Sequence, residues 1–592
     1  MRRKPLLGLM LLSGILLASV SLPGRAADEK AEKAKAKAKL KEQRVAAKKA
    51  AEAKKAADEK AAAEKERKEA EARRAAAEKI QKEREAKGES VAKFKPAKIG
   101  GDKDAIGVAR FIDSHIDAKL AAEKVPASPA STDEEFLRRA YLDITGVIPT
   151  AEQAKSFLDS HDPAKRAKLV DELLESPNYG RHRADLWMGI LVERTSDNRR
   201  VNFDSLRKWL AEQFAANKPW DAMVSDILTA TGDQEKNPAV GFFLSNNTVD
   251  KMTDETAKAF LGVQLQCAQC HDHKFNDWKQ TEYWAMAQFF MKVQVGGLGK
   301  DQTPGIQETQ NVRRNKMNPL PESAKSVEPK FLQGEHPTVA KSEPYRPVLA
   351  KWMTAPTNPF FAKAMTNRVW AELFGRGIVN PVDDMVGQNL PSHPELLEGL
   401  AADFAANGFD VKHLIRSICN SAAYARSSKS VGGNETAAPH LYAKRSVRVL
   451  SAEQLFDSLA AVTKFQDNAK AREKGMKAGP AGARERFVNF FLAGAEMVNP
   501  VEYEAGIPQA LKLMNSRQTG AANPAIVRAV VGTARGTEAI EKIYLAALSR
   551  RPTPAESDRL AKYLDTSGGL SQDALGDVVW AVLNSSEFTL NR

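Results

Sequence analysis

The stretch TDEEFLRRAYLDITGVIPTAEQ, residues 132–153, decides the fold class of this 592-residue chain. Thr132 followed by three acidic residues is typical of a helix start, because a hydroxyl caps free backbone N–H groups and acidic side chains favour the first turn. Gly146 and Pro149 end that helix, and Thr150 begins the next one. The stretch therefore predicts two helices joined by a short turn.

The same pattern of helices and turns continues on both sides. Apolar residues at helical spacing predict helices at residues 106–120, 165–174, 183–193, 203–215, 220–230, 253–266 and 281–291. Residues 296–345 are rich in Gly, Pro, Asn and Lys and indicate a surface connection between domains. A second helical domain is expected at residues 346–592, with a mobile insertion at 468–484. The predicted fold class is mainly α, in two helical domains.

One pattern occurs near both ends of this body. Tyr141 lies eight residues before Pro149, and Tyr544 lies eight residues before Pro552. In both places a helix ends near the proline, another begins just after it, and a further amphipathic helix ends in a serine. The repetition predicts a helical hairpin module that is used twice, although chance similarity between two helical turns would also explain it.

The first hundred residues differ in composition from the rest. A basic start, an apolar run at 6–22 and small residues near position 26 predict a signal peptide, residues 1–26, and hence a periplasmic or secreted protein. No second apolar stretch is long enough to span a membrane, so no transmembrane segment is expected in the mature chain. Residues 27–100 are mostly Ala, Lys, Glu and Arg and predict a helical or disordered spacer that could associate with the cell envelope.

The basic charge of the chain is concentrated in this N-terminal region. Of the formal net charge of +13, the signal region contributes four and residues 28–88 a further seven, so the remaining body carries only about +2. A nearly neutral body with no basic stripe makes nucleic acid an unlikely partner. A redox partner or an envelope component is the expected kind of partner.

The strongest chemical motif is Cys267-Ala-Gln-Cys270-His271. Cys-x-x-Cys-His is the attachment signature of haem c: two thiols bond the vinyl groups, and the imidazole of His271 is an axial ligand of the iron. The third cysteine, Cys419, lies in an apolar helical stretch and is expected to be a buried packing thiol. The motif predicts an electron-transfer or redox protein.

Two other readings of the same residues stay open. Cys267, Cys270, His271 and His273 are four ligand-type residues that could hold zinc or another divalent ion without haem, in a binding or scaffold protein. Asp272 could then orient one imidazole. The third reading is a short-range disulfide between Cys267 and Cys270. If haem binds, the distal ligand is open, with three methionines as candidates: Met252, Met286 and Met291.

A polar cluster farther along is the weaker candidate site. Asp383, Asp384 and His393 could perform acid–base chemistry, as in an enzyme that acts on extracellular polymers. In the structural alternative, the aspartates cap a helix or pair with Arg368 or Arg376, while Ser392 is an N-cap. No Gly-rich phosphate loop, Gly-x-Ser-x-Gly elbow or His-Glu-x-x-His motif is present, so the sequence does not decide whether the protein is an enzyme.

Several motifs together resemble a planctomycete-type pair of domains of unknown function. The cytochrome-c-like first domain, expected at residues 104–295, is indicated by Phe136-Leu-Arg-Arg-Ala-Tyr-Leu-Asp143, Thr145-Gly146, Pro149-Thr150 and the Cys-x-x-Cys-His-x-His stretch. Its usual partner domain, expected at 346–592, is indicated by Asn358-Pro-Phe-Phe361, Asn367-Arg-Val-Trp370, Phe374-Gly-Arg-Gly377, Pro381-Val-Asp-Asp384, Ser392-His-Pro-Glu-Leu-Leu397 and Asn584-Ser-Ser-Glu-Phe588. The resemblance implies an exported protein and supplies no reaction.

Overall fold

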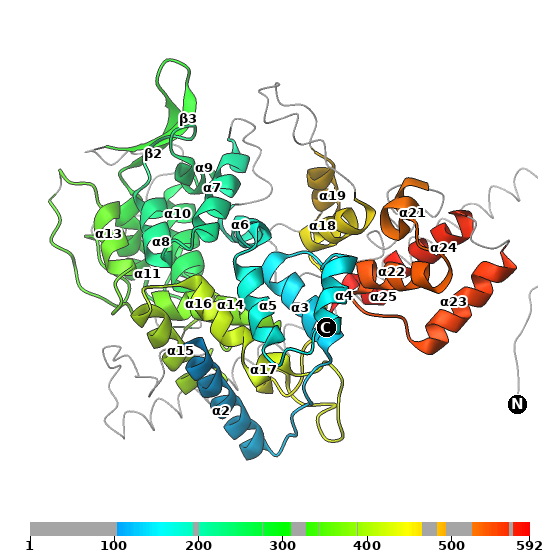
Figure 1. The fold of residues 1–592 in the computed structure, drawn as a ribbon. Coiled ribbons are helices and arrows are strands. Elements are labelled where there is room, and N and C mark those ends of the chain that lie inside the picture. Colours follow the sequence, from blue (N-terminus) through cyan, green and yellow to red (C-terminus); the bar gives the residue numbers. More distant parts are fainter. Residues whose placement is uncertain are drawn as a thin grey trace, which may run out of the picture. The chain divides into compact units, whose positions relative to one another are not determined.

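The structure is a computed structural model, and it describes residues 104–192, 201–309 except 275 and 277, 327–464 except 341, 387 and 388, 482–492, 524–567 and 572–592. Helices dominate these residues, as Figure 1 shows, so the predicted mainly α fold is confirmed. The predicted signal peptide and spacer lie outside them. In the described part of the chain, no helix is both long and apolar enough to cross a membrane.

The helices before residue 293 follow the sequence prediction closely, and α5 and α7 have the predicted bounds. Their order is α2 (Ala105–Glu123), α3 (Asp133–Thr145), α4 (Ala151–Asp159), α5 (Lys165–Leu174), α6 (Pro177–Leu191), α7 (Phe203–Ala215), α8 (Trp220–Thr229), α9 (Gly241–Ser245), α10 (Val249–Thr256) and α11 (Gln280–Ala287). Short 3-10 turns stand at Pro238–Val240, Gln266–Gln269 and Gln288–Phe290.

A second run of helices fills the rest of the described chain. It consists of α13 (Arg346–Met353), α14 (Phe361–Phe374), α15 (Pro394–Ala406), α16 (Val411–Cys419), α17 (Ala422–Ala425), α18 (Ala452–Thr463), α19 (Ala483–Phe491), α21 (Pro524–Val531), α22 (Gly536–Leu548), α23 (Pro554–Thr566), α24 (Gln572–Leu583) and α25 (Ser586–Thr589). A 3-10 turn stands at Pro439–Leu441. Most of the predicted insertion at 468–484 lies outside the described residues.

Strands occur where the sequence predicted a connection. β2 (Val293–Leu298) and β3 (Thr303–Glu308) form an antiparallel hairpin, and β1 (Gly232–Asp233) pairs with β3, so the strand order is β1-β3-β2. Residues 296–345 were expected to form a surface connection, and most of this hairpin lies within them. Glycines in both strands hid it, because glycine is depleted in strands.

Local side chains explain where the helices begin and end. The Thr132 hydroxyl accepts a hydrogen bond from the backbone N–H of Glu135, and Gly146 ends α3 with a φ of 71°. Thr150 and Gln153 form a capping box at the start of α4. The start and end that the sequence predicted for α3 are therefore confirmed, together with the cap that begins α4.

The two predicted hairpin modules are present. Helices α3 and α4 form the first and α22 and α23 the second, and a capping box begins the second helix of each module. Helix α4 also packs against α22, so the two modules contact each other although almost 400 residues separate them in sequence.

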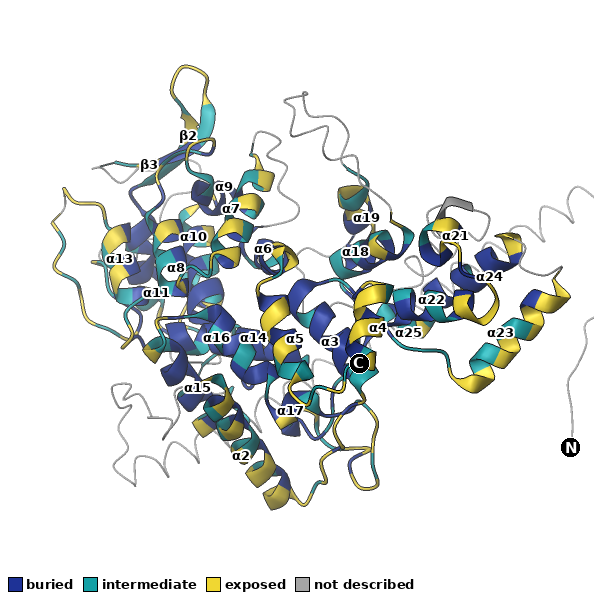
Figure 2. Cartoon of the chain, in the orientation of Figure 1, coloured by how far each residue is buried: buried dark blue, intermediate teal, exposed yellow. Residues whose placement is uncertain are grey.

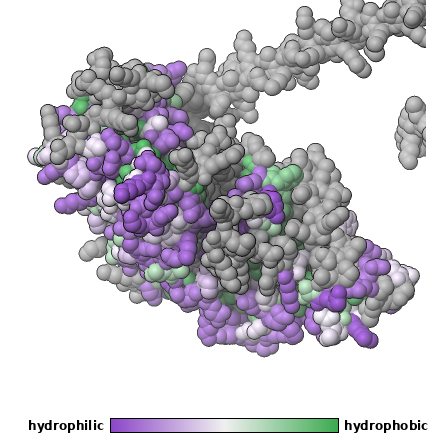
Figure 3. All heavy atoms as spheres, turned by 90° about the horizontal axis from the view of Figure 1, so that it is seen from above, coloured by the Kyte–Doolittle hydropathy of each residue, from purple (hydrophilic) through white to green (hydrophobic). Residues whose placement is uncertain are grey.

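Buried side chains form two hydrophobic clusters. The first joins helices from both sides of the predicted connection at 296–345, and the second is built mainly from residues 450–588, with Leu142 and Ile148 packed into it. Figure 2 shows α3 and α14 as almost entirely buried, whereas α23 is largely exposed. On the face shown in Figure 3, hydrophilic residues dominate the described surface. The domain boundaries proposed from sequence stay a prediction.

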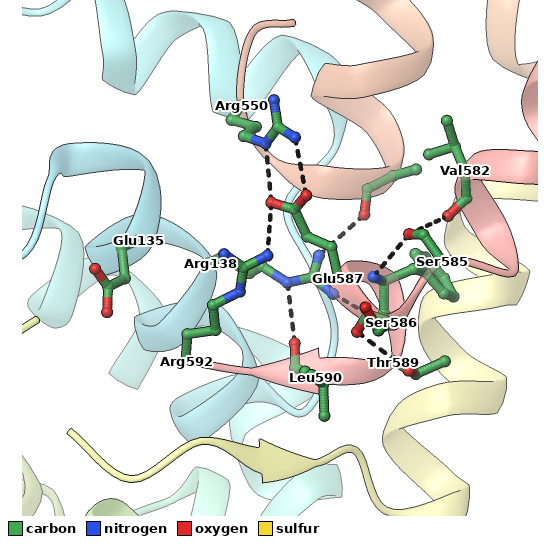
Figure 4. Close-up of polar contacts among 12 residues, drawn as sticks. Glu135, Arg138, Arg550, Val582, Ser585, Ser586, Glu587, Thr589, Leu590 and Arg592 are labelled. Atoms are coloured by element: carbon green, nitrogen blue, oxygen red, sulfur yellow. Dashed lines mark hydrogen bonds and ion pairs between the residues drawn. The ribbon is translucent and has the colours of Figure 1, made fainter. Parts of the chain in front are cut away.

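Residues 588–592 dock onto α3, as Figure 4 shows around Arg138. The buried Arg138 guanidinium donates to the backbone oxygens of Ala547 (2.9 Å), Phe588 (2.6 Å) and Leu590. β5 (Leu590–Asn591) pairs with β4 (Arg448–Val449) beside it. Helix α3, whose apolar side chains lie mainly in the first hydrophobic cluster, is thereby joined to segments of the second.

A buried carboxylate one turn farther along α3 completes this junction. The Asp143 side chain is 1% exposed, and it accepts hydrogen bonds from Tyr424 Oη, Arg445 Nη2, Arg448 Nη2 and Asn591 Nδ2 at 2.9, 2.7, 2.6 and 2.7 Å. These four donors come from three segments of the chain: Tyr424, residues 445–448 and Asn591. Asp143 therefore joins them at one point.

Candidate functional site

The Cys-x-x-Cys-His segment follows a break in the helix. After α10 the backbone makes a π-helical turn at Ala257–Leu261, and Gly262 ends it with a φ of 65°. The prediction that the helix runs directly into Cys267 is therefore wrong, because the left-handed Gly262 stops it five residues earlier. Cys267 instead lies in the 3-10 turn at Gln266–Gln269.

Three cysteines fall into two environments. Cys267 and Cys270 are exposed free thiols, and neither forms a disulfide in this structure. Cys419 is buried, and burial raises the pKa of its thiol far above the usual value. The prediction that Cys419 is a packing thiol is confirmed. Only the two motif cysteines are accessible to a reagent or a cofactor.

The ring of His271 is exposed, and the backbone orients it. Its Nδ1 atom lies 2.7 Å from the carbonyl oxygen of Asp272. A carbonyl oxygen only accepts, so this contact favours the tautomer with the proton on Nδ1 and leaves the lone pair on Nε2. The sequence suggested that Asp272 orients an imidazole; its backbone oxygen does so, rather than its side chain.

Helix α11 holds the turn from behind. The Gln280 amide donates to the carbonyl oxygens of Gln269 (3.1 Å) and Cys270 (2.9 Å), and Trp284 Nε1 also donates to Gln269 O (3.1 Å). The backbone N–H of Gln280 donates to the carboxylate of Asp272, which lowers the pKa of that acid. These contacts fix the backbone of the turn and leave its thiols free.

A buried acid lies behind the same helix. Tyr283 is 1% exposed, and its hydroxyl, like Oδ1 of Asp254 on α10, has no hydrogen-bond partner within the described residues. Burial raises the pKa of Asp254 to about 7. Sequence reasoning missed this pair, because nothing in the local pattern links residues on two helices on either side of the motif.

The structure also tests whether the motif residues form a closed metal site. His273 is half-buried, and its pKa is lowered by burial and by the neighbouring His271. Within the described ranges, no three His, Cys, Asp or Glu side chains gather as a metal site would require. The four-residue metal site proposed from sequence is therefore not assembled in this conformation.

The residues present fit haem c better. Its attachment needs two accessible thiols on one turn and one imidazole with a free Nε2, and Cys267, Cys270 and His271 meet those needs. The candidate distal methionines all lie in the first hydrophobic cluster: Met252, Met286 and Met291. The structure does not identify a distal ligand.

The second candidate site does not assemble as a catalytic triad. His393 is buried against Tyr442 with Nδ1 3.1 Å from the Ser392 hydroxyl, and burial lowers its pKa to about 4. Nε2 of His393 has no hydrogen-bond partner among the described residues, so neither aspartate bonds to that ring nitrogen. The N-cap of α15 is His393, so the prediction that Ser392 is the cap is wrong by one residue.

Asp383 faces the segment before the cysteine motif instead. Its Oδ1 accepts from Gln264 Nε2 at 2.9 Å, and its Oδ2 lies 3.9 Å from Lys258 Nζ. The side chain of Asp384 is half-buried, and burial together with Asp383 raises its pKa. The two aspartates thus differ in environment. Asp383 lies within ion-pair distance of Lys258, and its charge also acts on the buried Arg368, one of the two arginines considered from sequence.

Two family models match the chain. Residues 111–295 match PSCyt2, a protein of unknown function (DUF1549), and residues 345–485 match PSD1, a protein of unknown function (DUF1553). The body thus contains the planctomycete pair of domains of unknown function that the motifs indicated. Neither a curated protein nor a solved structure matches the chain.

Proposed function

We propose that the Cys267–His271 turn is an attachment site for haem c and that the protein carries electrons outside the cytoplasm. The observation that supports this most strongly is the state of the turn itself. Two exposed thiols and an imidazole with a free Nε2 lie within five residues on a backbone that α11 holds in place. The signal-like N-terminus adds the expected periplasmic or secreted location.

Each residue of the turn has a definite chemical task. The thiols of Cys267 and Cys270 would each add across a vinyl group, so that sulfur bonds one vinyl carbon, hydrogen goes to the other, and nothing leaves. His271 would offer Nε2 to the iron, and the Asp272 carbonyl orients the ring by accepting from Nδ1–H. Bound haem would supply a one-electron redox couple, for a redox partner or an envelope component.

The test uses protein purified from its native exported compartment. Absorbance is recorded before and after dithionite, followed by a haem assay under denaturing conditions. We expect a reduced c-type band and haem that stays with the denatured chain. The Cys267→Ser/Cys270→Ser variant should lose covalent haem, whereas Cys419→Ala, which removes the buried thiol, should keep it.

Two results would contradict the proposal. Haem that remains covalent in the double variant would place the attachment elsewhere, and a featureless spectrum of the native protein would remove haem altogether. Elemental analysis of the same sample then separates the remaining alternatives. Zinc or another divalent ion would favour a scaffold protein with a Cys/His metal clip, and a metal-free oxidised sample would favour a disulfide.

A further inference from the structure

Residues of the second matched domain contact the segment that leads to Cys267. Three hydrogen bonds join them: Arg368 Nη2 to Lys258 O at 3.0 Å, Met385 N to Gly262 O at 2.8 Å, and Gln264 Nε2 to Asp383 Oδ1 at 2.9 Å. The contacted positions follow one another within residues 258–264, which lead to the turn. Residues of the domain that matches PSD1 therefore hold the segment before the turn, while α11 holds the turn itself.

The backbone at Gly262 shows how close this contact is. Gly262 adopts a φ of 65°, and a Cβ there would lie 3.3 Å from both Ala364 Cβ and Met385 Sδ. Glycine permits both the left-handed conformation and the close approach to α14. The chain therefore leaves the π-helical turn in a direction that residues of the second matched domain define.

Asp383 provides the last contact before the cysteine turn. Gln264 precedes Cys267 by three residues, and its exposed side chain reaches the Asp383 carboxylate. The Asp383 side chain is 14% exposed, and its charge also supports the buried Arg368 guanidinium, which donates to the π-helical turn. A single carboxylate thus supports two of the three contacts.

We propose that Asp383 is a positioning residue for the cysteine turn: through Gln264 it lets the second matched domain set how Cys267 and Cys270 are presented. In that view Asp383 contributes to the geometry of the turn and does not act as an acid or base. Its role in haem attachment rests on the proposed function, whereas its effect on the geometry of the turn does not.

The experiment measures thiol reactivity in reduced, haem-free full-length protein. Alkylation rates of Cys267 and Cys270 are followed separately by peptide mass spectrometry, with amide hydrogen exchange at residues 263–268 as a second readout. Losing a hydrogen bond to a charged group on a partly exposed turn should raise the Cys267 rate about threefold to tenfold in Asp383→Ala. Gln264→Ala should raise the Cys267 rate to the same extent. The rate in the double variant should be no higher than in either single variant, because both substitutions remove the same contact.

Two further variants sharpen the result. Asp383→Asn retains an oxygen acceptor for Gln264 and should restore most of the wild-type rate. Asp384→Ala removes the neighbouring carboxyl, which is neither hydrogen-bonded nor ion-paired to any of the described residues 258–264, and should leave the rate unchanged. Cys419 serves as an internal control, because it stays unreactive while the body is folded.

Unchanged alkylation and exchange in Asp383→Ala, or an equal effect of Asp384→Ala, would overturn the positioning role. If Asp383→Ala exposes Cys419 and so fails to fold, Gln264→Ala decides, since that exposed side chain is dispensable for packing. Because these rates are measured without haem, a native protein that lacks haem would contradict the proposed function and leave this inference standing.

Discussion

Replacing Asp143 with asparagine should destabilise the protein more than any other conservative change considered. Two guanidinium groups, those of Arg445 and Arg448, bond to its carboxylate, together with the Tyr424 hydroxyl and the Asn591 amide. The side chains of Asp143 and Arg445 are each 1% exposed, so water cannot replace the lost charge there.

The expected loss of stability depends on how deeply each of the two arginines is buried. Removing one partner of a buried ion pair costs about 3–5 kcal/mol, because the other charge is left uncompensated. Arg448 is 20% exposed and is partly screened by water, so the cost should lie near the low end, at about 3 kcal/mol. Asparagine also places an NH₂ group opposite hydrogen-bond donors where the aspartate has an oxygen, and this donor–donor contact adds to the loss of stability.

Urea unfolding is the appropriate assay, followed by two probes because the body has two hydrophobic clusters. Native-state hydrogen exchange at α3 and β5 should show the same loss locally. Tyr424→Phe is the matched control, since it removes one neutral donor from the same carboxylate and should cost only about 1 kcal/mol. An Asp143→Asn variant within about 1 kcal/mol of wild type would refute the reasoning.

Three further predictions concern single positions. Gly146→Ala should lower stability by about 1–2 kcal/mol more than the control Gly408→Ala. Both glycines have a positive φ, but only at Gly146 would a Cβ lie 2.5 Å from His182 Nδ1. Equal melting temperatures of the two variants would contradict this. Burial lowers the pKa of His393 to about 4 from the usual 6.5 of a histidine, so between these values only the unfolded chain binds that proton. Stability should therefore fall as the pH drops through this window, and His393→Gln should flatten the dependence of melting temperature on pH there. Burial raises the pKa of Asp254 to about 7 from 3.8, so only the folded chain binds that proton in this range, and stability falls as the pH rises through it. Asp254→Asn should therefore gain stability relative to wild type from pH 4 to 7. A stability difference between variant and wild type that does not change with pH would count against the buried acid.

The helices were predictable because their signals are local. The caps of α3 and α4 and the apolar spacing of α5 and α7 lie within a few residues of the elements they define. The hairpin of β2 and β3 was missed, because its glycines disfavour strands and because β3 also pairs with β1, where Gly232 lies opposite Ile306 and Asp233 opposite Gly305, more than 70 residues apart.

The candidate site divides in the same way. Spacing alone singled out Cys267, Cys270 and His271, but not the side chains that hold them. Gln280 contacts the turn from the following helix, and Asp383 contacts Gln264 across 119 residues of sequence. Such contacts exist only after the helices have packed, so no local pattern could show that a suspected catalytic acid faces the approach to the cysteine turn.

The contact between Arg138 and the residues near position 590 has a consequence for the order of events during synthesis. Its guanidinium finds two of its acceptors on Phe588 and Leu590, 450 and 452 residues later in the chain. Until those residues have left the ribosome, α3 has no partner for a charge that must be buried, and such distant contacts form slowly. The first hairpin module therefore cannot reach its final packing while the chain is still growing. If the protein is exported as proposed, this delay would keep the body from folding before it crosses the membrane.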